Sequence, residues 1–406
     1  MKQYKESIFL VIGLFGVFFF QSIPSYEKVK DTPNARDFSS FYYAQKNVFR
    51  GSTPYSSKEL GALARSENTR TYVHPYFYPP PAVYLFTWAQ GLSLHSAYLW
   101  FWGINQIATL GLLVLLKRWI GMSWLPIGLL FALCFPIQDC MMMGQVNIIV
   151  LLLMVWGLYK NQGGVFAAAA MIKMSPALLL LPQIIWKKWR FIGYAIAFAI
   201  ISSLLTLPIM NIFDQISFYT IVLPQFSSGQ YSGLTVPINI DSNHSIPELC
   251  GQLFPSKNTK ELSDTARICA PMINVGILSI LSWLAWKNPN SKHVLGAFIV
   301  LMVLTPIYTY EHHLVFLLVP AAILLHSCKE RAWFFTICAY MTLFFLFWPL
   351  SWWREAQTSL PQVAWGIQES KTFSALSMMV LLCYCTLRPV LNESEPVLLE
   401  TEKRVQ

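Results

Sequence analysis

The sequence predicts an all-α, polytopic membrane protein, and three observations lead to this fold class. The chain has 406 residues, of which 55% are hydrophobic and only 12% are charged. An ordinary soluble domain has about a quarter of its residues charged. The mean hydropathy is +0.47. Apolar stretches recur along the chain and are close in length to the roughly 20 residues that cross a bilayer as a helix.

The apolar stretches predict about twelve membrane spans. They lie near residues 7–23, 80–94, 96–116, 123–141, 145–160, 163–184, 191–210, 270–286, 294–310, 312–327, 332–350 and 373–388. We expect one transmembrane domain over residues 1–390 and a cytoplasmic tail at 391–406. Two large outer loops, about 24–80 and 211–268, are expected to carry helices that lie along the membrane surface.

The positions of Lys and Arg predict that both termini are cytoplasmic, because positive residues near span ends are retained on that side. Lys117 and Arg118 violate this assignment. If residues 80–94 form a re-entrant or surface helix, these two move inside. The basic group at 187–190 then moves outside, unless a second span is also miscounted.

The net charge of +9 follows largely from this topology signal, so we expect no nucleic-acid partner. In the first outer loop the excess of Lys and Arg suits anionic lipid head groups or a lipid phosphate. A solvated loop with no particular partner could carry the same excess. The eight cysteines have no metal-binding spacing. Cys250 and Cys269, at the second outer loop, either form a disulfide on an oxidising side or stay free.

The run from Asn34 to Tyr55 carries the first chemical candidate. Its pattern predicts an interfacial helix from Phe38 to Phe49 that Gly51 ends. Asp37 lies at the first turn of this helix. Its carboxylate is either a general base just outside the bilayer or the N-cap of the helix, a position that Asp favours.

Two further groups are candidates within or next to spans. Lys173 is predicted near the middle of a span, where an ammonium either faces a polar cavity or belongs to an ion pair. Glu311, His312 and His313 lie together at an outer span junction. Adjacent helical residues point about 100° apart, so one histidine can face a cavity while the other packs against protein.

Taken in order, the motifs resemble glycosyltransferase family 87. The resemblance rests on Asp37-Phe38 with Tyr42, Tyr43, Ala44, Gly51 and Pro54-Tyr55, then Tyr78-Pro79-Pro80, Gly144-Gln145-x-Asn147, Lys173-x-x-Pro176, Asn243-His244-Ser245, and Thr305-Pro306 with His312-His313. The family usually has Ser-Pro and Trp before the paired histidines. Here Thr305-Pro306 and Tyr308 or Tyr310 occupy that region.

The resemblance implies a type C glycosyltransferase fold in a bacterial inner membrane, with the active site on the periplasmic or exterior face. It implies a polyprenyl-phosphate sugar donor, with mannose as the leading sugar, and a glycan or glycolipid acceptor. It implies no cofactor and no divalent metal. The alternative from another class is a polytopic lipid or sugar transporter that makes no bond. The oligomeric state is not determined by the sequence.

The resemblance also suggests roles for individual residues. Asp37 would deprotonate the acceptor hydroxyl, and a single carboxylate suits an inverting displacement. His312 or His313, together with Arg36 or Lys173, would hold the leaving phosphate. The other expected substrate-binding residues are Tyr42, Tyr78, Gln145, Asn147, Asn243 and Glu311.

Overall fold

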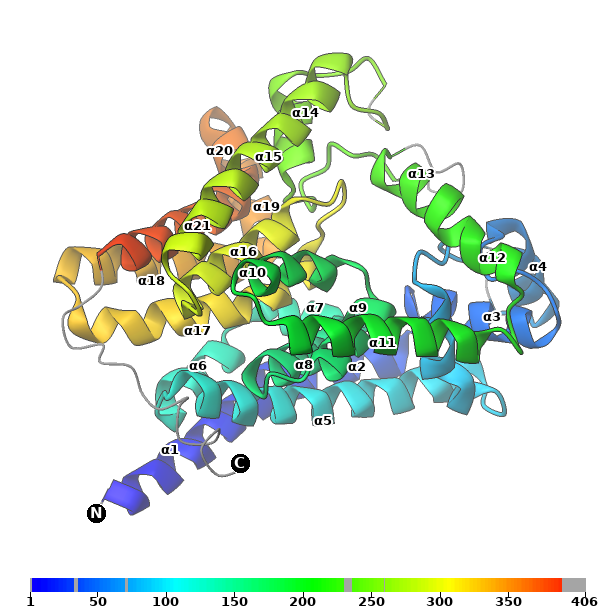
Figure 1. Ribbon diagram of the computed structural model, residues 1–406, viewed down its shortest axis with the longest axis horizontal. Helices are drawn as coiled ribbons and strands as arrows, with labels where there is room; N and C mark the ends of the chain where they lie inside the picture. The colour runs from blue at the N-terminus through cyan, green and yellow to red at the C-terminus, as the bar shows by residue number, and fades with distance from the viewer. Residues whose placement is uncertain (1, 33–35, 70–71, 230–235, 259, 389–406) are drawn as a thin grey trace.

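The computed structural model describes residues 2–32, 36–69, 72–229, 236–258 and 260–388. Within those ranges every regular element is a helix and there is no strand, which confirms the predicted all-α class. The expected tail at 391–406 lies outside the described residues. Figure 1 shows long helices side by side, with shorter helices α12 to α14 above them.

The first half of the chain comprises α1 (Lys2–Val17), η1 (Phe18–Ser22), α2 (Ile23–Asp31), α3 (Phe38–Phe49), α4 (Ser57–Ser66), η2 (Pro80–Ala89), α5 (Leu94–Ile120), α6 (Trp124–Ala132), α7 (Phe135–Met143), α8 (Asn147–Tyr159), α9 (Gly163–Ile172), η3 (Ser175–Leu179), α10 (Leu180–Ile185) and α11 (Trp189–Thr206). The π-helical turn η1 joins α1 to α2 without a break in the helix.

The second half comprises α12 (Ile212–Ser217), η4 (Phe218–Val222), α13 (Leu223–Ser227), α14 (Ile246–Leu253), α15 (Asp264–Lys287), α16 (Lys292–Leu304), η5 (Glu311–Leu317), α17 (Leu318–Ser327), η6 (Cys328–Glu330), α18 (Trp333–Phe347), α19 (Leu350–Ser359), η7 (Pro361–Val363), α20 (Ala364–Gln368) and α21 (Ser370–Leu387).

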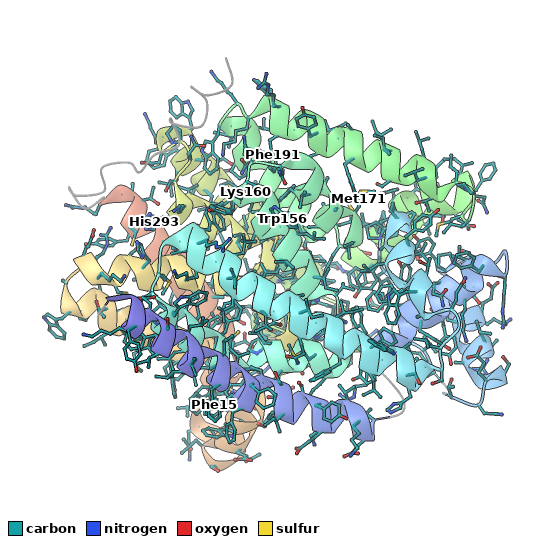
Figure 2. The ribbon with its side chains drawn as sticks, turned by 90° about the horizontal axis from the view of Figure 1, so that it is seen from below. Phe15, Trp156, Lys160, Met171, Phe191 and His293 are labelled. Carbon is teal, nitrogen blue, oxygen red and sulfur yellow. The ribbon has the colours of Figure 1, made fainter. Side chains whose placement is uncertain are left out.

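The expected count of twelve spans is not confirmed. Among the described residues, 6 helices are long and apolar enough to cross a membrane: Tyr4–Asp31, Leu94–Ile120, Trp189–Thr206, Asp264–Lys287, Glu311–Glu330 and Ser370–Leu387. The pairs α6–α7 and α18–α19 bend by 51° and 93°, and the number rises to 8 if each pair is one span. Phe15 on α1, 67% exposed, shows the lipid-facing character of the first helix at the edge of the molecule (Figure 2).

The other apolar stretches form short helices. All of α16 from Val294 to Leu304 is buried, so that stretch is apolar because it packs inside the protein. The stretch at 80–94 contains only the 3₁₀ helix η2, which begins with Pro80 and Pro81. Proline lacks an N–H and disfavours a helix interior, and this helix is too short to cross a bilayer.

The stretch at 163–184 reverses direction at Lys173. Gly163 packs against the backbone of Phe191, and the rings of Phe166 and Phe191 lie 5.3 Å apart. Helix α9 therefore starts beside the start of α11 and runs along it. In Figure 2, Met171 near the end of α9 lies farther along α11 than Phe191, which is near the start of α11. After Lys173 the chain returns through η3 and α10 to Trp186, just before α11.

Residues 80–94 do not span the membrane, and residues 163–184 turn back at Lys173. With these two corrections the basic groups lie at one end of the molecule, which we call the basic end (residues 117–119, 186–190 and 285–292). Lys292 Nζ donates to the carbonyl oxygen of Trp119 over 2.9 Å. Trp186 Nε1 donates to the carbonyl oxygen of Ala285 over 2.9 Å. Figure 2 shows Lys160, Phe191 and His293 on the same half of the molecule. Lys117 and Arg118 therefore no longer conflict with the other basic groups.

Helix α3 has the predicted bounds, and Gly51 follows it with a φ of +77°, as expected of a residue that ends a helix. The helix does not lie exposed along a surface, however. Its first residues are buried on all sides, and the Phe38 ring lies 5.9 Å from Phe86 and 5.2 Å from Phe101. The two cysteines of the second outer loop, Cys250 and Cys269, are free, so the disulfide alternative is wrong.

Candidate active site

A cavity of about 1330 Å³ lies away from the basic end, between the chain before α3 and the segment that leads into η5. Its wall carries eight of the predicted site residues: Arg36, Asp37, Tyr78, Gln145, Lys173, Glu311, His312 and His313. These come from five separate stretches of the chain. The cavity is large enough for a ligand bigger than a typical drug-sized molecule.

Asp37 is oriented by a relay of two side chains. Gln145 Nε2 donates to Asp37 Oδ2 over 2.7 Å, and Tyr78 Oη donates to Gln145 Oε1 over 3.0 Å. Burial, with the nearby charge of Asp37, raises the pKa of Tyr78 above its usual value, so its hydroxyl remains a donor. The carboxylate makes no cap hydrogen bond to α3. The N-cap interpretation is therefore wrong for the side chain, although Asp37 does occupy the N-cap position.

The turn at Gly144 places Gln145 beside Asp37. Gly144 has a φ of +68°, a left-handed conformation that glycine adopts without strain. A Cβ at this position would lie 2.6 Å from Phe38 Cβ and 2.9 Å from a ring carbon of Tyr98. The α7–α8 turn can therefore approach the start of α3 only because residue 144 has no side chain.

Lys173 faces the cavity from the break between α9 and η3 and not from the middle of a continuous helix. Its Nζ donates to Asn147 Oδ1 over 2.8 Å, and Asn147 Nδ2 donates to the carbonyl oxygen of His312 over 2.8 Å. A single asparagine thus joins the ammonium group to the backbone of the histidine pair. The ion-pair alternative for Lys173 finds no support among the described residues, because its hydrogen-bond partner is a neutral amide.

The two histidines have different partners, but both line the cavity, so the expectation that only one of them would face it is wrong. His312 Nδ1 lies 3.5 Å from Asp139 Oδ2, and this carboxylate also lies in the cavity wall, as do those of Asp37 and Glu311. His313 Nδ1 accepts a hydrogen bond from the Tyr310 N–H over 3.0 Å. In its neutral form, His313 consequently carries its proton on Nε2.

Glu311 is held by two cationic or polar partners. Lys371 Nζ donates to Glu311 Oε2 over 2.6 Å, and His244 Nε2 lies 2.8 Å from Glu311 Oε1. Lys371 also donates to the carbonyl oxygen of Trp348 over 2.7 Å. The carboxylate therefore anchors η5 to the second outer loop and to α21, and its hydrogen-bonding capacity is largely used.

Three predicted substrate-binding residues do not line the cavity. Tyr42 is buried, and its hydroxyl donates to the carbonyl oxygen of Leu92. Asn243 is buried, and its amide bonds to the backbone of Ile238, Ile307 and Thr309. Asn147 is buried behind Lys173. The side chains of Tyr42 and Asn243 therefore bond to the backbone, and Asn147 bonds to Lys173 and to the backbone of His312.

Sequence reasoning missed Asp139, His244 and Lys371. Asp139 had a readable signal, since an acidic residue inside an apolar stretch is a functional candidate by default. His244 stood next to Asn243 in a motif that was already noted. Lys371 had no such signal, because it looks like an ordinary basic residue beside a span. Its role depends on the approach of α21 to η5.

Comparison with known protein families agrees with the resemblance that the sequence motifs indicated. A family model described as glycosyltransferase family 87 matches residues 76–309, which is more than half of the chain. Tyr78, Asp139, Gln145, Lys173 and His244 lie inside the matched region, whereas Asp37 and the histidine pair lie outside it. No curated protein matches the chain. The apolar helices indicate a membrane protein, and the chain belongs to glycosyltransferase family 87.

Proposed function

We propose that this membrane glycosyltransferase moves a monosaccharide, with mannose as the leading expectation, from a polyprenyl-phosphate donor to a lipid-linked or envelope glycan. The observation that carries the proposal is the cavity wall. It brings the carboxylate of Asp37 together with Lys173, Arg36 and the histidine pair. A base for an alcohol and several donors for a phosphate are the groups that such a transfer requires.

Asp37 would act as the general base. Its Oδ2 already accepts a hydrogen bond from Gln145, which leaves lone pairs on the carboxylate to accept the acceptor's hydroxyl proton. As this proton moves to Asp37, the hydroxyl oxygen forms a bond to the anomeric carbon. The bond between that carbon and the phosphate oxygen breaks at the same time, so one displacement inverts the anomeric configuration.

The leaving phosphate gains negative charge as this bond breaks. Arg36 and, when it is protonated, Lys173 are cations on the cavity wall, and the His313 Nε2 proton adds a neutral donor. Such groups stabilise a developing oxyanion most strongly where water is excluded. Asp139 lies beside His312 and would orient its ring, in the way that a carboxylate commonly orients a histidine.

The proposal places the cavity on the non-cytoplasmic face of a bacterial inner membrane, with both termini in the cytoplasm. Support comes from the basic end, which is remote from the cavity wall and is the end that the positive-inside rule assigns to the cytoplasm. Family membership favours the enzyme over the transporter alternative.

Asp37→Asn tests the proposal. We would incubate the purified full-length protein with a panel of polyprenyl-phosphate sugars and a membrane lipid extract, and measure the glycosylated product. Asn retains the size of Asp and can still accept from Gln145, but it cannot take a proton. We expect a folded variant that binds the donor and transfers about 10²- to 10⁴-fold more slowly, the usual effect of losing a general base.

Asp31→Asn, at an exposed position near the end of α2, is the matched control and should keep wild-type activity. If Asp37→Asn retains more than about a tenth of the wild-type rate, which is outside that range, Asp37 is not the base. Asp139→Asn is then the next candidate to measure. Absence of transfer from every polyprenyl-phosphate sugar would contradict the proposed donor class.

A further inference from the structure

Glu248 and Glu369 form a buried acidic pair outside the cavity wall. Glu248 lies in the first turn of α14, and Glu369 directly precedes α21. They are 0% and 1% exposed. Gln252 Nε2 donates to Glu248 Oε1 over 2.6 Å. Glu248 Oε2 and both carboxylate oxygens of Glu369 have no hydrogen-bond partner.

No positive side chain balances this pair among the described residues. The groups that act on the two carboxyls are each other, Gln252 and Thr372. Nearby cations have other partners: Lys371 is bonded to Glu311 and Arg354 to Asp241, at 2.6 Å each, and His244 contacts Glu311. Two buried carboxylates without a counter-charge would destabilise the fold considerably.

Further oxygen atoms at this place lack partners. Thr372 is 0% exposed, its Oγ1 has no hydrogen-bond partner, and it lies beside the carboxyl of Glu369. The adjacent Ser370 Oγ is also buried without a partner. Both carboxylates lie at helix N-termini, where the helix dipole favours the ionised form. The cluster thus offers carboxylate and hydroxyl oxygens, and no cationic group among the described residues is paired with them.

We propose that Glu248 and Glu369, with the hydroxyl of Thr372, bind a divalent cation of the calcium type. Ca²⁺ is a hard cation that takes carboxylate, hydroxyl and carbonyl oxygens in irregular arrangements. It would neutralise the buried pair and satisfy the free oxygens together. Mg²⁺ fits less well, because it retains several waters and demands regular octahedral geometry.

The bound cation would stabilise one wall of the cavity. The segment 244–248 carries both His244 and Glu248, and the segment 369–371 carries both Glu369 and Lys371. His244 and Lys371 are the two partners of Glu311. A cation between Glu248 and Glu369 therefore joins the same two segments that fix Glu311 next to the histidine pair. This inference does not depend on the identity of the donor.

Calcium binding can be measured without any substrate. The full-length protein, purified in detergent and treated with a chelator, would be titrated with CaCl₂ or MgCl₂ at pH 8 while unfolding is followed by tryptophan fluorescence. We expect Ca²⁺ to raise Tm by a few degrees in a saturable manner, and Mg²⁺ to do so only at higher concentration.

The double variant Glu248→Gln with Glu369→Gln should lose the Ca²⁺ response, because the ligand charges are gone. Thr372→Val keeps both carboxylates and should shift the titration to higher Ca²⁺, which tests the site even if the double variant does not fold. Glu355→Gln, an exposed glutamate on α19, is the matched control and should respond as the wild type does.

Two results would overturn the proposal. One is a Tm of the chelated wild type that Ca²⁺ does not change. The other is an equal Ca²⁺ response in Glu355→Gln, Thr372→Val and the glutamine variants. In either case the two carboxyls instead share a proton.

Discussion

The two roles that the sequence position of Asp37 suggested concern different parts of the residue: its backbone occupies the N-cap position, and its side chain is the proposed general base. The backbone starts α3, while the carboxylate points to Gln145 and the cavity. A side chain that capped the helix would have its oxygens occupied by backbone N–H groups. Because Gln145 takes a single oxygen, the carboxylate stays available for an acceptor hydroxyl.

The partners of the two histidines lead to a prediction for each. His312→Ala removes a ring that Asp139 orients, whereas His313→Ala removes a ring that the Tyr310 N–H holds. We expect His313→Ala, which removes the proposed Nε2–H donor, to raise the barrier of transfer by about 2.7–4 kcal/mol, the scale for one oxyanion donor, and His312→Ala to have a smaller effect. Initial rates at saturating donor would measure both.

His326→Ala, at the opposite end of α17, is the control and should leave the rate unchanged. Small and equal losses in the first two variants, with normal amounts of folded protein, would contradict a role of either ring at the leaving group.

At the scale of elements, breaks between helices form most of the site. Lys173 lies between α9 and η3, Gln145 between α7 and α8, and Asp37 before α3. At each of these positions the backbone is not part of a continuous helix. The side chain is therefore not restricted to a helix face and can point into the cavity. The short α8 and α9 therefore serve to bring their ends to the cavity.

Gly144→Ala tests how tightly the α7–α8 turn packs. The substitution forces a Cβ into a left-handed backbone position and against Phe38 Cβ, 2.6 Å away. We expect a loss of about 1–3 kcal/mol of stability, seen as a lower Tm, together with reduced transfer because Gln145 shifts. Gly103→Ala in α5, where nothing lies within 4 Å, should be neutral or slightly stabilising. Equal Tm values for the two variants would contradict this packing.

The contact between α14 and α21 should also depend on pH. Burial raises the pKa of both Glu248 and Glu369 above the usual glutamate value. A carboxyl with a raised folded-state pKa contributes stability that is fully present below its unfolded pKa, about 4.3. This contribution is lost as the pH rises through the folded-state pKa. In a chelator, Tm should therefore fall from acidic towards alkaline pH.

Thermal scans between pH 5 and pH 9 would measure this slope, with Glu369→Gln as the variant that should flatten it. A slope of the same size in Glu369→Gln would assign the pH dependence to other groups.

At the scale of the whole molecule, the basic end contributes no residue to the cavity wall. The hydrogen bonds of Lys292 to Trp119 and of Trp186 to Ala285 unite basic groups that are far apart in the sequence. Because positive residues are retained in the cytoplasm, this arrangement predicts one orientation for the protein.

Cysteine labelling in right-side-out membrane vesicles tests that orientation. In a background whose accessible native cysteines are replaced by serine, Ser52→Cys and Lys257→Cys should react with a membrane-impermeant maleimide. Lys187→Cys should react only after permeabilisation. All three positions are exposed, so differences in labelling report the side of the membrane. Labelling of Lys187→Cys before the other two would invert the proposed topology.

The sequence by itself determined the class of the protein, the bounds of α3 and eight of the polar residues in the cavity wall. Hydrophobic composition decides membrane insertion locally, and a glycine that ends a helix acts on its own neighbours. All of these eight except Tyr78 carry a carboxylate, basic or amide group, and such groups in an apolar chain are costly unless they have a use.

Only the tertiary structure decided which apolar stretches are buried within the protein, and which polar residues support others. A buried core helix such as α16 and a lipid-facing helix have the same composition, because both environments exclude water. Asn243 looked like a ligand-binding residue and proved to bind the backbone, while Lys371 looked ordinary and holds Glu311. These roles depend on contacts between residues that are 60 or more positions apart in the chain. Such contacts arise only when the helices pack.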